Sequence, residues 1–237
     1  MKLGPHLHRI GNDIVAAYLV LTDEGITVID AGLAGHWRDL QRELAAVGRP
    51  LSDVRGIVLT HGDTDHLGFA ERLRLTSGIP VYVHSADAAR AKGGEKPKAS
   101  AGRMRLGPTL GFLAYSIRKG GWRTKYLTDV VPVEDGDVLD LPGSPQIIGL
   151  PGHSPGSVAV YVPAARALFV GDALTTRHVL TGQRGPQPAP FTDDPAQALE
   201  VLDRVTGLQQ VDWVLPGHGA PWNGPVTGLA AEVRAKA

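Results

Sequence analysis

The stretch Thr60-His61-Gly62-Asp63-Thr64-Asp65-His66 holds four potential metal ligands within six residues. It follows directly on the apolar run Ile57-Val58-Leu59, where we expect a buried strand to end and open into a loop. Carboxylates crowded at such a position repel one another unless a positive charge lies among them. The stretch therefore indicates a metal site.

The composition is that of an ordinary globular protein, with 43% hydrophobic and 20% charged residues in a chain of 237. Such a chain is long enough for one large domain or two small ones. No apolar run approaches the length of about 18 residues that a transmembrane helix needs, and the N-terminus lacks the apolar segment of a signal peptide. Cysteine is absent, which leaves His, Asp and Glu as metal ligands. We expect a cytoplasmic enzyme or binding protein.

The charge is unevenly distributed although the net charge is zero. Between Arg90 and Tyr126 there are ten basic residues and one acidic residue, Glu95. Such asymmetry favours a small anionic or acyl-bearing partner near this segment, and a solvated insertion is the alternative. Residues 106–117 within it are mostly apolar, too few to span a bilayer, and suit a lid, a substrate wall, an interfacial patch or a homodimer contact. We treat 90–128 as a basic, partly apolar insertion in a single domain of residues 1–237.

Hydrophobic periodicity outlines alternating strands and helices. A hairpin is expected over 14–30 and a helix over 37–47, where apolar residues recur at helical spacing. The two strand-rich halves, each with helices, suggest two sheets packed face to face and covered by helices. Further strands are expected at 56–60, 81–83, 130–133, 138–141, 146–150, 157–162, 167–170 and 211–215, and further helices at 69–76, 86–92, 194–208 and 226–235.

Three further positions share the character of the opening stretch. His153, Asp172 and His218 each follow an expected strand and are flanked by Gly or Pro, which form tight turns. A metal site needs several ligands held rigidly by separate elements, and strand ends provide this. Together the four sites indicate one metal centre.

The series His61-Gly62-Asp63-Thr64-Asp65-His66, His153, Asp172 and His218 resembles the metallo-β-lactamase superfamily, in the style of glyoxalase II-type thioesterases and lactonases. Asp30, in Val28-Ile29-Asp30-Ala31-Gly32, resembles an early aspartate of that family. The resemblance spans about residues 8 to 222. It implies an α/β fold of the four-layer αββα type with metals at one edge between the sheets.

The resemblance also implies how two divalent ions would be held. His61, Asp63 and His153 would bind one ion, and Asp65, His66 and His218 the other, with Asp172 and a hydroxide bridging them. Two ions about 3.5–4 Å apart lower the pKa of a shared water and polarise a scissile carbonyl or phosphoryl group. Asp65 would help position the hydroxide and move its proton.

Residue 63 departs from the family pattern, which usually has His there. With two divalent ions, three aspartates and a hydroxide the site sums to about zero, whereas His at 63 would leave one positive charge. A less positive site acidifies water less, and a harder ligand shifts the preference from zinc toward iron or manganese. The alternative is that Asp63 is too short to bind and only one metal is held firmly.

Other candidates have weaker support. Gly152-His153-Ser154-Pro155-Gly156 fits the pattern of serine hydrolases, but Pro155 has no backbone N–H for an oxyanion hole. We expect Asp30 to orient a ligand through a hydrogen bond and His84, after a strand, to lie in the same outer layer. His178 and Tyr115 are candidates for substrate binding.

His6, His8 and His36 have no supporting context in the sequence, and we interpret them as surface residues.

The sequence thus predicts a metal-dependent hydrolase of an ester, thioester, lactone or phosphoester, without a nucleic-acid partner. The first alternative is an iron-dependent oxidoreductase of the same fold, similar to persulfide dioxygenases or di-iron flavoproteins. A nuclease would use the basic segment, but we expect a chain of this length to be too short for the extra domain that RNA-processing members of the superfamily carry. A binding module with a degenerate site is the remaining alternative.

Overall fold

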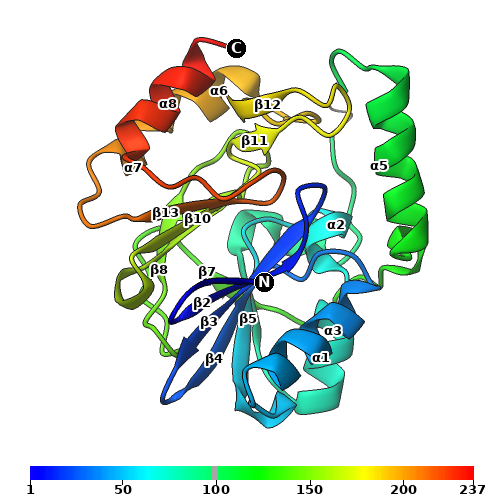
Figure 1. The fold of residues 1–237 in the computed structure, drawn as a ribbon, viewed down its shortest axis with the longest axis vertical. Helices are drawn as coiled ribbons and strands as arrows, with labels where there is room; N and C mark the ends of the chain where they lie inside the picture. Colours follow the sequence, from blue (N-terminus) through cyan, green and yellow to red (C-terminus); the bar gives the residue numbers. More distant parts are fainter. Residues whose placement is uncertain (98–100) are drawn as a thin grey trace.

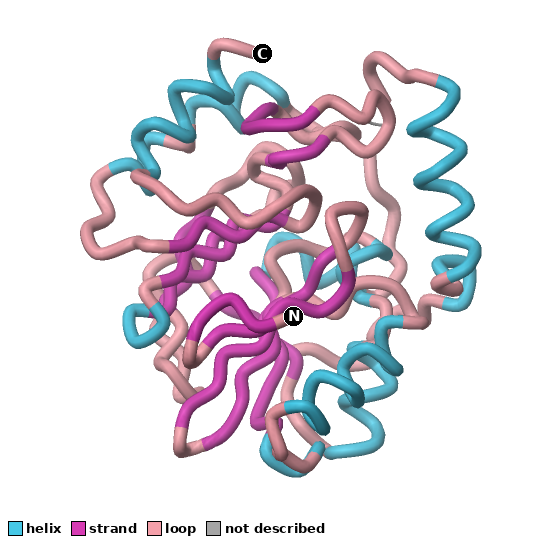
Figure 2. The backbone as a smooth tube through the Cα atoms, viewed as in Figure 1, coloured by secondary structure: helices cyan, strands magenta, loops and turns pink. Residues whose placement is uncertain are grey.

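In the computed structural model, which describes residues 1–97 and 101–237, strands occupy the middle of the molecule and helices the outside (Figure 1, Figure 2). The larger sheet has seven strands in the order β1 to β7, and the smaller has four in the order β13-β10-β9-β8. The larger sheet consists of β1 (Lys2–Gly4), β2 (Leu7–Gly11), β3 (Ala16–Thr22), β4 (Gly25–Ile29), β5 (Val54–Val58), β6 (Val81–His84) and β7 (Val131–Val133). The smaller consists of β8 (Gln146–Gly149), β9 (Val158–Val162), β10 (Ala167–Gly171) and β13 (Trp213–Pro216), and β11 (Thr175–Arg177) pairs with β12 (Arg184–Gln187).

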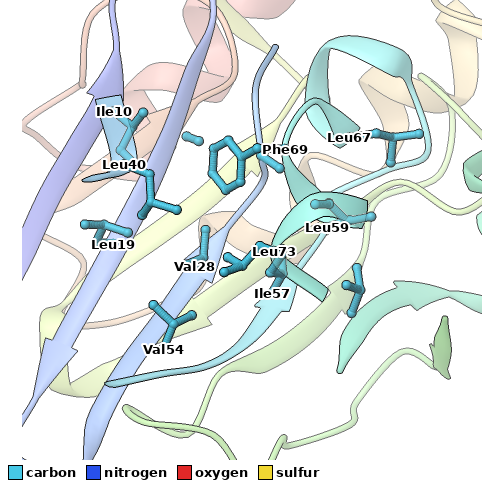
Figure 3. Packing of buried hydrophobic residues seen from close by; sticks show 14 of the residues in the cluster. Ile10, Leu19, Val28, Leu40, Val54, Ile57, Leu59, Leu67, Phe69 and Leu73 are labelled. Atoms are coloured by element: carbon cyan, nitrogen blue, oxygen red, sulfur yellow. The ribbon is translucent and has the colours of Figure 1, made fainter. Parts of the chain in front are cut away.

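Three apolar layers hold the sheets and helices together. One lies between the two sheets and includes Tyr18, Val58 and Phe169. A second lies between the larger sheet and the helices α1 (His36–Ala46) and α3 (Ala70–Ser77), as Figure 3 shows for Leu40, Ile57 and Leu73. The third lies between the smaller sheet and α6 (Pro195–Glu200), α7 (Asp203–Thr206) and α8 (Val226–Arg234). This arrangement confirms the predicted αββα sandwich.

The strand directions gather several loops at one edge. In the larger sheet β4, β5 and β6 are parallel, so their carboxyl ends lie together. In the smaller sheet β8 and β10 each run antiparallel to β9, and β10 is parallel to β13, so β8, β10 and β13 also share a direction. Loops that leave the carboxyl ends of these strands are available to form one site.

Two predicted elements are wrong. Residues 138–141 form no strand, because Pro142 has no N–H to continue a ladder and only Val138 makes a bridge, to Gln146. The helix expected over 194–208 is divided into α6 and α7. The bonds from Arg204 N to Val201 O and from Val205 N to Leu202 O span three residues, and this tighter turn interrupts the helix.

The basic segment contains one long helix, α5 (Leu106–Arg118), which runs along the outer edge of the molecule (Figure 1). The short α4 (Ala88–Ala91) precedes it and a single 3-10 turn (Gly121–Arg123) follows it. Lys98, one of the ten basic residues, lies outside the described residues. No helix in the described parts of the chain is long and apolar enough to cross a membrane.

His36 is fully buried, which corrects its interpretation as a surface residue, and His8 is also buried beside Glu43. The Nδ1 of His36 accepts a hydrogen bond from Leu33 N, so its proton lies on Nε2 and is donated to the Tyr115 hydroxyl at 2.8 Å. Burial, with the nearby Lys119 ammonium, lowers the pKa of His36 to about 3. The ring therefore links α1 to α5 in its neutral form.

This neutral histidine predicts an acid-sensitive fold. The unfolded chain takes up a proton near pH 6.5 that the folded chain refuses until about pH 3, so stability falls as the pH drops through this window. His36 is expected to contribute a loss of about 1.4 kcal/mol per pH unit. Urea unfolding at several pH values should show a shallower dependence for His36→Asn, whose amide oxygen can still accept from Leu33 N. Leu75→Gln, at an exposed position without a titratable group, should keep the wild-type slope, and equal slopes in all three proteins would contradict the assignment.

Candidate metal centre

The loops at the carboxyl ends of the strands bring the sequence-predicted ligands to one place. His61 follows β5, His153 follows β8, and His218 follows β13. Asp172 comes directly after β10. The short helix α2 (Thr64–Leu67) carries Asp65 and His66, with Asp63 immediately before it.

The ligand atoms converge. Three groups of side chains each offer ligand atoms that lie within 4.8 Å of one another: His61, Asp63 and His153; Asp65, His66 and His218; and His61, His66 and Asp172. The Asp172 carboxylate lies between the first two groups, with one oxygen 3.6 Å from His66 Nε2 and the other 3.1 Å from His218 Nε2 and 3.8 Å from His153 Nε2. Two sets of three side chains thus meet at one aspartate.

The inward-facing atoms lack partners. Within the described residues the buried Nε2 atoms of His61, His66 and His153 and the Oδ1 atom of Asp172 accept or donate no hydrogen bond. A buried polar atom left without a partner is costly. Imidazole nitrogens and carboxylate oxygens in this arrangement suit a transition metal such as zinc or iron. The residues present therefore fit bound metal ions.

The outward-facing ring nitrogens set the tautomers. His66 Nδ1 donates to Asp30 at 2.9 Å, and His218 Nδ1 donates to the carbonyl of Ile14. The hydroxyls of Thr60 and Thr192 already donate, to Asp30 and to Ala189 O, so the Nδ1 atoms of His61 and His153 donate to them. All four rings therefore keep a proton on Nδ1 and turn Nε2 inward, the orientation that a metal ligand requires.

Asp30 connects two of these ligand loops. Its carboxylate accepts from His66 Nδ1 and from both the backbone N–H and the hydroxyl of Thr60. It does so from a backbone with φ of 58°, which is uncommon for a residue other than glycine. A strained backbone at such a position is a sign of a functional constraint. Asp30 thus lies behind the candidate ligand His66 and holds Thr60, the residue before His61.

Asp63 is held from behind by two cations. Arg90 donates to both its oxygens, at 2.6 and 3.0 Å, and Lys96 donates to Oδ1 at 3.1 Å. The other side of the buried Arg90 guanidinium donates to Asp193 at 2.7 Å. The Oδ2 atom of Asp63 still faces the site, 3.6 Å from His153 Nε2 and 4.0 Å from His61 Nε2. Asp63 Oδ2 is therefore close enough to His61 and His153 to share a metal ion with them.

Asp87 fastens two ligand loops to each other. Its fully buried carboxylate accepts from Gly62 N at 2.7 Å in one loop, and from Gly156 N at 2.8 Å and the Ser154 hydroxyl at 2.7 Å in the other. The Ser154 hydroxyl is thus fixed in the protein interior rather than presented as a nucleophile. Asp87 sets the distance between the loops of His61 and His153.

The charges at the centre stabilise ionised carboxylates and a protonated His66, whereas burial lowers the pKa of His61. Burial alone would raise the pKa of Asp172, but His218 and His66 hold it well below its usual range. Burial would lower the pKa of His66, and the opposing carboxylates of Asp30 and Asp172 raise it instead to about 9. A metal that binds His66 must displace that proton.

The remaining predicted site residues lie farther from the ligands. The ring of His84 contacts Ala86 N and Glu134 rather than a candidate ligand, because its strand β6 turns into a 3-10 turn that the ring caps. Tyr115 is buried against His36, so packing and not substrate contact accounts for it. His178 lines a cavity of about 700 Å³ together with Ala173, next to Asp172, and with Thr192, the partner of His153.

Sequence analysis missed the residues that support the ligands. By charge alone Arg90 belongs to the basic segment, and neither Asp87 nor Asp193 stands in a motif of the sequence. The helical turn after β6 held the only signal, since Asp87 and Arg90 are three residues apart on one side of it.

Comparisons with known proteins agree with this geometry. The family model described as "Metallo-beta-lactamase superfamily" matches residues 10–218. Among relatives, "Probable metallo-hydrolase YflN" of Bacillus subtilis is 32% identical over 72% of this chain and 66% of its own length. "Hydroxyacylglutathione hydrolase" of Rhodobacter capsulatus is 29% identical over 74% of this chain and 54% of its own. The matches therefore span about two thirds or less of these relatives.

Two solved structures share the fold. The metallo-β-lactamase family protein TTHA1429 of Thermus thermophilus has a TM-score of 0.72 at 24% identity, covering 99% of this chain and 80% of that one. TTHA1623 "in a di-iron-bound form" has a TM-score of 0.62 at 29% identity, covering 98% and 96%. The αββα sandwich, the converging histidines and aspartates and the match over residues 10–218 together establish that this chain belongs to the metallo-β-lactamase superfamily.

Proposed function

We propose that this chain is a metal-dependent hydrolase of an ester, thioester, lactone or phosphoester. The observation that carries the proposal is the pair of ligand sets that meet at Asp172 with unpartnered atoms turned inward. His61, Asp63 and His153 would hold one ion, Asp65, His66 and His218 the other, and Asp172 both. Bound there, two divalent ions would supply an acidified water and an electrophile for the scissile group.

The chain's own residues would handle the proton. Burial would raise the pKa of Asp65, but the hydrogen bond from His218 and the charge of His66 lower it, so this carboxylate is ionised. Its Oδ2 lies 3.4 Å from His218 Nε2, and about a quarter of its side chain is exposed. These features support a role for Asp65 in which it would accept a proton from the attacking water and release it to solvent.

The proposed substrate enters beside Asp172. The cavity of about 700 Å³ has Ala, Pro and Leu side chains on its walls, and Arg103 and His178 among its polar ones. This mixture suits a substrate with an apolar acyl part and an anionic part. The relative named hydroxyacylglutathione hydrolase supports a thioester as the first class to test.

Iron chemistry is the second candidate function, favoured by Asp63 and by the di-iron form of TTHA1623. The contacts of Asp63 weaken the argument for iron that rests on its negative charge. Arg90 and Lys96 offset the charges of Asp63 and Asp193, so these four groups together add no net charge. The centre is then about as positive as one with His at 63, which supports a water-activating zinc site.

Activity and oxygen use distinguish the two functions. We expect anaerobically purified protein to contain about two equivalents of divalent metal and to hydrolyse thioesters or lactones. Treatment with a chelator should abolish hydrolysis and zinc should restore it. Elemental analysis, a panel of ester and thioester substrates and an oxygen electrode provide the measurements. Oxygen consumption without hydrolysis, in an iron-loaded protein, would support the oxidoreductase instead.

Loss of the Asp30 charge should weaken metal binding without removing a ligand. Asn tolerates the same positive φ, but its amide binds His66 less strongly than a carboxylate does. Asp30→Asn is expected to lower metal affinity about 10- to 100-fold, measured by competition with a chelating dye. The matched control is Asp212→Asn, which breaks an exposed pair with Arg166. Equal affinities in the two variants would contradict the assigned role of Asp30.

Asp63 and Arg90 should be coupled. Asp63→His leaves the buried Arg90 with one partner fewer beside a metal site, so we expect the free energy of unfolding to fall by about 1–3 kcal/mol. Asp63→His with Arg90→Gln should recover much of that loss in urea unfolding. Both variants should shift metal preference toward zinc. If neither metal content nor preference changes, Asp63 is not a ligand.

A further inference from the structure

The outer face of α5 is an uncovered apolar stripe. Leu106, Leu110, Leu113 and Ile117 recur at intervals of four, three and four residues, which places them along one side of the helix. Their exposed fractions, over the described residues, are 78, 54, 49 and 66%. The inner side is already occupied, since Tyr115 and Phe112 pack with Val15 and Leu33. The stripe is therefore an additional face that the fold itself does not use.

Further exposed apolar side chains extend the stripe at both ends. Met104 precedes the helix and is 60% exposed, and Trp122 follows it and is 69% exposed. Monomeric proteins rarely leave a contiguous apolar surface of this kind without an interaction to serve. The large aliphatic side chains together with a terminal Trp are typical of helices that lie in a membrane interface.

The charge around the stripe is of one sign. No acidic residue occurs in the sequence between Glu95 and Asp129. Arg103 and Arg105 lie just before the helix and Arg118 at its end, and Arg123 stacks on Trp122. These four arginines form no ion pair with a carboxylate of the described residues, so their charges are available to an anionic partner.

A basic groove adjoins the C-terminal end of α5. It has a volume of about 1190 Å³ between α1, α3 and the residues after α5. Its two acidic residues are already paired, Asp39 with Arg42 and Lys119, and Glu71 with Arg74 and Thr128. Its basic lining comprises Arg38, Arg42, Arg72, Arg118, Lys119, Arg123 and Lys125. The positive field is therefore continuous from the groove to the C-terminal end of the stripe, where Arg118 and Arg123 belong to both.

These charges argue against a second copy of the chain as the occupant. If two α5 helices packed antiparallel, Arg103 and Arg105 of one would face Arg118 of the other, and in parallel packing each arginine would face its equivalent. Either arrangement places like charges opposite each other, which is destabilising. A helix of 13 residues is also only about 20 Å long, too short to span a bilayer but suited to lie in its surface.

We propose that α5 docks this protein on an anionic lipid bilayer. The stripe of Leu106, Leu110, Leu113 and Ile117 enters the boundary between headgroups and acyl chains, Trp122 lies at the headgroup level, and the arginines at both ends contact anionic headgroups. Apolar burial and attraction to the anionic lipid add together, so binding requires both.

Sedimentation with lipid vesicles tests this docking. Full-length protein should bind vesicles of phosphatidylglycerol and phosphatidylcholine at least about tenfold more strongly than vesicles of phosphatidylcholine alone. High salt should reduce the binding, because it screens the arginines. L110Q/L113Q/I117Q removes apolar area while it keeps residues of good helix propensity, and should lower binding about tenfold or more. R118Q/R123Q should reduce the preference for the anionic vesicles, and R103Q/R105Q/R118Q/R123Q should remove it.

The control variant is V138Q, which replaces a side chain of similar exposure, 62%, outside α5 and the groove. It should bind like the unchanged protein, and circular dichroism should show that all variants are folded. Weak and equal binding to both kinds of vesicle would overturn the proposal. A dimer in analytical ultracentrifugation that L110Q/L113Q/I117Q dissociates would assign the stripe to self-association instead. Binding to an acidic polypeptide such as polyglutamate, without binding to vesicles, would assign it to an acidic protein partner.

Discussion

The crowding of buried ligand atoms around Asp172 is the constraint on which the rest of the structure depends. Four imidazoles and several carboxylates meet there, and the inward atoms of His61, His66, His153 and Asp172 lack hydrogen-bond partners, an arrangement that bound cations would stabilise. An outer layer holds these side chains in place: Asp30 behind His66, Asp87 between the loops of His61 and His153, and Arg90 behind Asp63. Two packed sheets supply the rigid strand ends that this layer needs.

The site also requires the backbone at two glycines to lie very close to the candidate ligands and their partners. A Cβ atom at Gly217 would lie 2.5 Å from both Asp172 and His66, and one at Gly171, where φ is 50°, would lie 2.2 Å from the Thr60 hydroxyl. The two sheets therefore meet at the metal centre through glycines, because any side chain there would displace a ligand or its hydrogen-bond partner. These glycines account for the flanking pattern that the sequence shows around Asp172 and His218.

The candidate ligands could be chosen from the sequence because each is local to a strand end and to its turn residues. The αββα layers could be predicted because buried strands such as β5 and β10 read as apolar runs, and α1 as an amphipathic pattern. Residues whose role depends on distant partners could not be predicted. Arg90 lies 27 positions from Asp63 and 103 from Asp193, and the Tyr115 hydroxyl that pairs with His36 comes from α5, 79 positions away. Propensity likewise did not reveal the break at 201–202, which arises from the hydrogen-bond geometry of one turn.

The role of the basic segment could not be predicted for the same reason, because it depends on partners that are distant in the sequence. A count of charges shows ten basic residues between Arg90 and Tyr126 but not which way each points. The structure divides seven of the described ones by their partners. Arg90 and Lys96 turn toward Asp63, and Lys119 toward Asp39, so these charges stabilise the protein's own carboxylates. Arg103, Arg105, Arg118 and Arg123 stay outside, beside the apolar stripe of α5. One segment thereby offsets the negative charge of the metal centre from within and presents a positive surface to an external partner, so its net charge alone identifies neither role.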